Sequence, residues 1–145
     1  MDFITTIIIV VAGIYLWSKY WANDSEKDAR QLGEYYKERI EYFKRSSLPF
    51  AGQNIKEYEK LLKRLGKSYE EYIHLLERYR HASFIKKWNL RQDWRMYIQA
   101  HKDRNESDME YGMGLNDKLL QKAKEREYRA EIRLDEIEKS FRKLL

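Results

Sequence analysis

The chain opens with a run of residues that is uncharged and apolar on every face of a helix. The run extends from Phe3 to Ser18 and is rich in Ile and Val. Counted on to Ala22, with Lys19 reaching toward lipid headgroups, it gives about 20 residues and about 30 Å of helix, which matches the hydrocarbon core of a bilayer. The pattern predicts a single N-terminal transmembrane anchor over residues 1–22.

The end of this run predicts a membrane interface, because aromatic and basic side chains gather there as they do in the aromatic belts of membrane proteins. The residues are Trp17, Lys19, Tyr20 and Trp21. A cleaved signal peptide and a buried core helix are the alternatives. The chain begins Met1-Asp2, without a basic region, and no clear cleavage site follows the run, so a signal peptide is disfavoured.

Charge around the run predicts its orientation. No Lys or Arg precedes it, whereas Lys19, Lys27 and Arg30 follow it closely. The positive-inside rule then places the rest of the chain on the cytoplasmic side, or on the matrix side in a mitochondrion. We expect the mitochondrial inner membrane in preference to a bacterial inner membrane.

Residues 23–116 predict a charged, aromatic-rich helical domain. Hydrophobic positions at helical spacing indicate one helix over about residues 25–45 and a short second helix over 55–65, closed by Gly66. The capping-box pattern of residues 68–71 opens the next helix. Its apolar phase slips later, which predicts a bend near Asn89. The acidic, glycine-containing segment 105–116 is predicted to be a loop.

Residues 117–145 carry the most regular pattern, an apolar seam with 3-4 spacing. The seam consists of Leu120, Ala123, Ala130, Leu134, Ile137, Phe141 and Leu144, with Glu127 as its polar member. A narrow seam of this period is typical of a long amphipathic or coiled-coil helix. It predicts packing either on the chain's own domain or on a partner helix. Glu127 disfavours a symmetric homodimer, and homo-oligomerisation stays open.

Composition supports an all-α fold of about four to five helices behind the anchor. Of 145 residues 37% are charged, and there is one Pro and six Gly to interrupt helices. Cysteine is absent, which excludes disulfides and thiolate chemistry. Twelve Tyr, four Trp and five Phe are many for so charged a chain, and they predict broad contact surfaces.

The basic excess is confined to residues 78–104, where eight Lys or Arg oppose two Asp, a net charge of +6. Basic and aromatic side chains alternate there, which suits an anionic lipid surface or an acidic protein face. Nucleic acid is less favoured, and a solvated helix face is the plain alternative. The candidate contact residues are Arg78, Arg80, Lys86, Lys87, Trp88, Arg91, Trp94 and Arg95.

No pattern in the sequence indicates catalysis. His74 and His81 are seven residues apart, too far to share a metal ion on one helix, and His101 stands alone. Gly112 and Gly114 form a lone G-x-G without the strand and lysine of a phosphate loop. We therefore expect no enzyme activity, no metal, no cofactor and no catalytic residue.

The layout of an N-terminal span followed by charged helix is similar to that of the peripheral-stalk b subunit of ATP synthase. Pro49, Gly52, Gly66 and the aromatic richness depart from a continuous stalk, so no residue role is carried over. The sequence predicts a non-catalytic accessory or scaffold subunit of a larger membrane complex, of the respiratory or ATP synthase kind. Its expected partners are membrane lipids and other subunits. The alternative is a bacterial or phage single-pass protein that recruits a soluble partner.

Overall fold

The computed structural model describes residues 2–112 and 116–145, except for the side chains of 17–23 and 110–112. Four helices make up this part of the chain, and it contains no strand. They are α1 (Phe3–Lys44), α2 (Ala51–Arg78), α3 (Phe84–Gly112) and α4 (Asp117–Leu144). The prediction of an all-α fold is confirmed.

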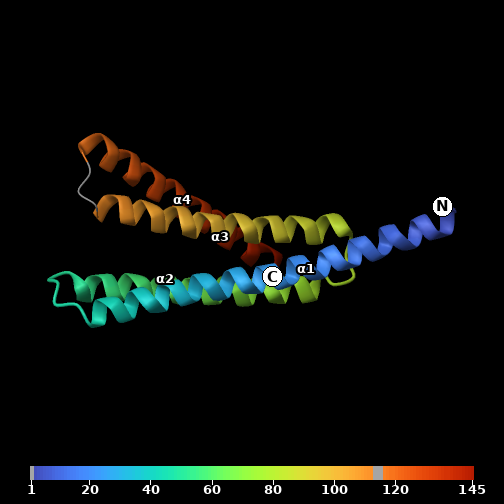
Figure 1. Ribbon diagram of the computed structural model, residues 1–145, viewed down its shortest axis with the longest axis horizontal. Coiled ribbons are helices and arrows are strands. Elements are labelled where there is room, and N and C mark those ends of the chain that lie inside the picture. The colour runs from blue at the N-terminus through green and yellow to red at the C-terminus, as the bar shows by residue number, and fades with distance from the viewer. Residues whose placement is uncertain (1, 113–115) are drawn as a thin grey trace.

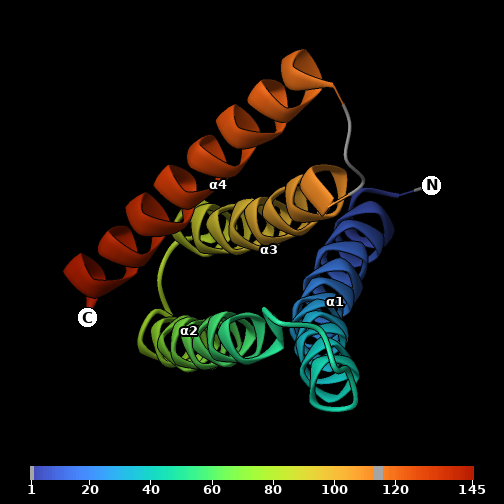
Figure 2. The same cartoon turned by 90° about the vertical axis from the view of Figure 1, so that its left-hand side faces the viewer.

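The helices pair into two hairpins, α1 with α2 and α3 with α4, which pack together through α3 (Figure 1). In Figure 2, α1, α2 and α3 are seen nearly end-on, whereas α4 crosses α3 obliquely. α4 also contacts α2, and α3 contacts both α1 and α2. The N-terminal part of α1 continues beyond the end of the bundle (Figure 1).

The core between the hairpins is largely aromatic. Trp94 of α3 is fully buried and stacks on Tyr72 of α2, with ring centroids 4.9 Å apart and planes 10° apart. Tyr97 also stacks on Trp94, with ring centroids 5.5 Å apart, and the ring of Phe141 of α4 lies 6.1 Å from that of Tyr72. Many of the aromatic residues predicted to serve contact surfaces therefore hold the chain's own helices together.

The prediction of a single-pass transmembrane helix is wrong. Within residues 2–112 and 116–145, no helix combines the length and the apolar character needed to cross a membrane. The same finding contradicts the predicted single-pass localisation in a mitochondrial or bacterial inner membrane.

The predicted interface residues Trp17, Lys19, Tyr20 and Trp21 lie outside the described side chains. The backbone there is helical, so α1 runs without interruption past the predicted boundary at residues 22 and 23. The segment treated as an anchor and the first helix of the domain are one helix.

The predicted helix boundaries near Gly66 and Ser68 are also wrong, because α2 continues through both to Arg78. A side chain at Gly66 would meet no neighbour within 4 Å, so this glycine reflects open space and not a turn. Leu65 and Tyr72 on either side of it are buried on the same face. One continuous apolar face therefore outweighs the local stop signals.

The bend predicted near Asn89 is displaced, since the chain turns at residues 79–83 and α3 is helical from Phe84. The segment 105–116, predicted as a loop, is helical as far as Gly112, because Asn105 and Ser107 are buried against neighbouring helices. Residues 113–115, which include Gly114, lie outside the described part. The predicted start of the last helix at Asp117 is confirmed, with the Asn116 side chain accepting a hydrogen bond from the Leu119 amide at 3.1 Å.

Candidate functional site

The first turns of α1, about four in number, project from the bundle, and we call these residues, Phe3–Leu16, the N-terminal extension (Figure 1). Phe3 is 80% exposed, Ile8 61% and Leu16 64%. The exposed side chains occupy all sides of the helix, and they include Ile4, Ile7, Ile9, Val10, Val11, Ile14 and Tyr15 as well. An apolar surface this continuous on an exposed helix is typical of a binding surface.

The seam of α4, in contrast, is occupied by its own chain. Ala123, Ala130, Leu134, Ile137 and Phe141 are buried, and Leu120 and Leu144 are half-buried. α4 contacts both α3 and α2, and its C-terminal half carries the ion pairs with Arg64 of α2. Of the two packing modes left open by the sequence, the structure therefore shows the intramolecular one.

Arg64 of α2 fixes α4 by binding three carboxylates at once. Its guanidinium lies 2.8 Å from Glu131 and 2.6 Å from Asp135, and its Nε donates to Glu138. These acidic residues stand at i, i+4 and i+7 on α4, so one arginine can reach all of them. Sequence reasoning missed this contact. The acidic stripe beside the apolar seam was its only signal.

Arg104 of α3 completes this charge network from the other side of α4. Its Nε donates to Glu131, and its terminal nitrogens lie 3.5 Å from Asp108 and 3.8 Å from Glu127. Burial alone would raise the pKa of Glu131, but hydrogen bonds from Arg64 and Arg104 outweigh it and hold that pKa below its usual value. Glu127, the polar member of the seam, is thereby placed beside a cation of the same chain.

Burial dominates at Asp108, where it raises the pKa of the carboxyl to about 6. The Arg104 charge opposes this rise, while Glu127 and Glu57 add to it. A carboxyl of this kind can be catalytic, but it needs a reacting group beside it. Asp108 has an arginine and other carboxylates there, which is an arrangement for holding helices together.

The histidines do not form a metal centre. His101 is fully buried and bonded to Tyr36, whereas His74 and His81 are exposed on α2 and the following turn. Among the described residues, no group of three or more His, Cys, Asp or Glu side chains is placed to hold a metal ion.

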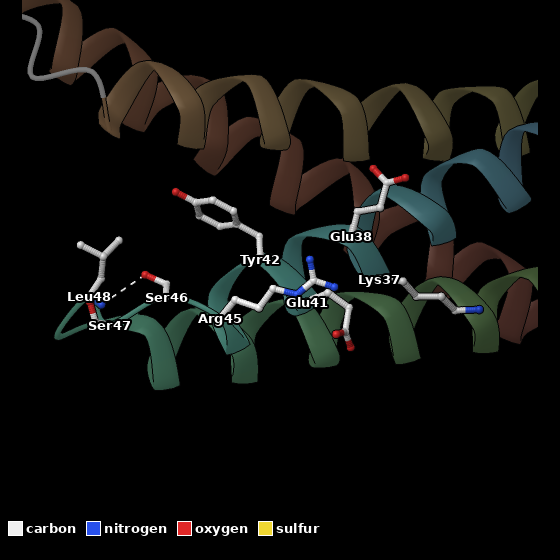
Figure 3. A pocket seen from close by; sticks show the side chains of 8 residues that line it. All are labelled: Lys37, Glu38, Glu41, Tyr42, Arg45, Ser46, Ser47 and Leu48. Carbon is white, nitrogen blue, oxygen red and sulfur yellow. Dashed lines mark hydrogen bonds between the residues drawn. The ribbon is translucent and has the colours of Figure 1, made fainter.

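A hollow of about 790 Å³ in the described surface lies at the end of α1 (Figure 3). Its walls are exposed side chains of α1 and the turn that follows, and the labelled residues diverge into solvent. The Ser46 hydroxyl accepts a hydrogen bond from the Leu48 amide at 3.2 Å and so belongs to the turn. The lining residues are Lys37, Glu38, Glu41, Tyr42, Arg45, Ser46, Ser47 and Leu48.

The structure divides the predicted contact residues of the basic stretch into two groups. Trp94 is fully buried in the core, so its assignment as a partner or lipid contact is wrong. Arg91 and Trp88 are half-buried, and Arg95 is exposed on α3. Arg78 donates to the backbone oxygens of Leu144, at 3.1 Å, and Leu145, which ties the end of α2 to the end of α4.

The remaining predicted contacts, Arg80, Lys86 and Lys87, lie where α2 turns into α3. Arg80 and Lys86 are exposed and Lys87 is half-buried. We call residues 78–92, which contain this turn, the α2–α3 corner. It is the part of the predicted basic surface that the fold leaves accessible.

Comparison with known proteins adds no assignment: no family model, curated protein or solved structure matches this chain. The fold and the surfaces described above therefore carry the functional argument.

Proposed function

We propose that this protein is a non-catalytic accessory or scaffold subunit of a larger protein assembly, and that the N-terminal extension joins it to that assembly. The observation that carries the proposal is the exposure of apolar side chains on all sides of residues Phe3–Leu16. Burying a side chain such as Ile or Leu is worth about 1.5–3 kcal/mol, so an extension of this kind gains much from a partner.

The shape of the extension favours several neighbouring helices over one. A helix that is apolar all round is stable when enclosed, whereas a single partner helix covers one stripe. The seam of α4 does not serve this purpose, because it is buried against α2 and α3.

The test is extraction of the full chain from its native cells in mild detergent, followed by native gel separation and mass spectrometry. We expect the protein to migrate with a stoichiometric set of other subunits. The variant Ile7→Ser/Ile8→Ser is expected to lose this comigration, since it places two hydroxyls on the extension.

The matched control is Ile73→Ser/Ile132→Ser, which makes the same chemical change at two exposed positions of the bundle. It is expected to comigrate like the wild type. A wild-type protein that migrates alone, or an extension variant that comigrates normally, would contradict the proposal.

A further inference from the structure

The α2–α3 corner is purely basic. From Arg78 to Gln92 the chain contains five Lys or Arg and no Asp or Glu. The nearest carboxylate on α2, Glu77, lies 3.7 Å from Arg80, but both side chains are mostly exposed, so the pair screens little of the charge. A surface of this composition attracts anions from solution.

Apolar side chains are exposed among these cations. Phe84 is 50% exposed and Ile85 70%, at the first turn of α3. Phe84 leans on Trp88 with ring centroids 6.0 Å apart, and the Lys86 ammonium lies 4.3 Å from the ring centroid of Tyr79. The corner therefore presents an aromatic and aliphatic centre with cations around it.

The corner lies at the end of the bundle from which the N-terminal extension projects (Figure 1). Ser25 of α1, Tyr72 of α2 and Trp94 of α3 lie at the same height along the bundle. The Ser25 hydroxyl is 3.3 Å from the Tyr72 hydroxyl, and the Ser25 carbonyl accepts a hydrogen bond from Trp94 Nε1 at 3.4 Å. From this level α2 runs six residues, about 9 Å, to Arg78, and α3 reaches back ten residues, about 15 Å, to Phe84.

Leu16, where the extension meets the bundle, is nine residues, about 14 Å along α1, from Ser25. The corner is thus level with the base of the extension. The end of α4 lies at the corner, because Arg78 donates hydrogen bonds to the backbone oxygens of Leu144 and Leu145. It adds two exposed cations, Arg142 and Lys143. Cations, exposed apolar side chains and an apolar extension therefore share one end of the molecule.

We propose that the α2–α3 corner binds the surface of an anionic phospholipid bilayer, with Arg80, Lys86 and Lys87 at the phosphates and Phe84 and Ile85 at the boundary of the acyl chains. Basic residues beside inserted aromatic and aliphatic side chains are the combination that such surfaces select. The contact is at the bilayer surface and requires no span.

A nucleic acid fits the corner less well. Single strands are held by bases stacked on accessible rings, but the most exposed apolar residue here is the aliphatic Ile85. An acidic protein face would match the charge but offers no apolar environment for the exposed Phe84 and Ile85. A lipid surface matches both the cations and the exposed apolar side chains of the corner.

The experiment is cosedimentation of the full chain with phosphatidylcholine vesicles made with or without phosphatidylserine. Wild type is expected to bind the serine-containing vesicles more tightly and to lose that preference in high salt. The variant Arg80→Gln/Lys86→Gln/Lys87→Gln is expected to bind them about a hundredfold more weakly, at about fivefold for each cation removed.

Lys56→Gln/Lys60→Gln/Lys63→Gln is the matched control, because it removes the same charge from exposed positions along α2. It should bind like the wild type. Thermal unfolding of both triple variants checks that the fold is intact.

Equal binding of wild type and corner variant to anionic vesicles would overturn the proposal, as would binding of wild type without regard to phosphatidylserine. Loss of binding to a single-stranded oligonucleotide in the corner variant, with vesicle binding unchanged, would assign the corner to nucleic acid and overturn it too. None of these outcomes affects comigration with other subunits, so the accessory role would stand or fall separately.

Discussion

The Tyr36 hydroxyl on α1 lies 2.7 Å from Nδ1 of His101 on α3, and both side chains are fully buried. The same hydroxyl donates to Asn105 Oδ1 at 3.3 Å. A neutral His101 with its hydrogen on Nδ1 donates to Tyr36, which leaves Nε2 as a bare acceptor instead of an unpaired N–H. Three polar groups thereby join the two hairpins within the core.

Replacing Tyr36 with Phe removes the hydroxyl and leaves the Nδ1–H of His101 and Asn105 Oδ1 buried without their partner. We expect the free energy of unfolding to fall by about 1–3 kcal/mol, since a buried group then loses its hydrogen bond. Urea unfolding followed by circular dichroism measures it. Tyr128→Phe is the control, because Tyr128 is 69% exposed. Equal midpoints for the two variants would contradict the role of the bond.

His101 also predicts a pH dependence. Burial, followed by the charges of Arg64 and Arg104, lowers the pKa of His101 to about 3, whereas an unfolded histidine has a pKa of about 6.5. Below about pH 6.5 the unfolded chain takes up a proton that the folded chain does not. The contribution of His101 is therefore full above that pH and is lost as the pH falls toward 3.

Asp108 acts in the opposite direction, because burial raises its pKa to about 6 and the folded chain gains a proton there first. The two groups partly offset each other between about pH 6 and pH 4, so wild type alone would show a weak dependence. His101→Gln removes one of them. Its stability relative to wild type is expected to rise by up to about 1.4 kcal/mol per pH unit below pH 6.5, measured by urea unfolding across this range. A constant difference between the two proteins would refute the assignment.

The helical class and the start of α4 could be predicted because each depends on local pattern. The seam spacing and Asn116 before Asp117 act over a few residues, and tertiary packing agrees with them. The breaks at Gly66 and Asn89 failed for the opposite reason. The buried face of α2 continues on both sides of Gly66 and outweighs its weak stop signal, whereas the bend expected at Asn89 lies earlier, at residues 79–83.

The candidate surfaces could be predicted only in part, because a one-dimensional pattern does not say which face is covered. Trp94 and Lys87 belong to the same basic and aromatic stretch, but α1 and α2 cover the first and leave the second accessible. The ion pairs of Arg64 could not be predicted from the sequence, because they depend on α2 lying beside α4, more than 60 residues away along the chain. The predicted span is contradicted because no helix among the described residues is both long and apolar enough to cross a membrane.

Arg64→Met tests how far charge holds α4 in place. The variant keeps an aliphatic side chain but leaves three carboxylates of α4 without their shared cation, so we expect a loss of about 2–3 kcal/mol in the free energy of unfolding. Hydrogen exchange of α4 amides is expected to accelerate as well. Arg80→Met is the control, since its pair with Glu77 is exposed and worth less than about 1 kcal/mol. Exchange in α4 at the wild-type rate would show that the apolar seam alone holds the helix.

The N-terminal extension is expected to contribute nothing to the stability of the bundle, which a pair of identical substitutions can establish. Ile8 is 61% exposed, so Ile8→Ser should change the free energy of unfolding by less than about 0.5 kcal/mol. Ile98 is 3% exposed, and Ile98→Ser should cost about 3–4 kcal/mol through the cavity and the buried hydroxyl. Urea unfolding of the two variants gives both values. Destabilisation by Ile8→Ser on the scale of Ile98→Ser would mean that the extension packs on its own chain, and its exposed apolar side chains could then no longer be attributed to a partner.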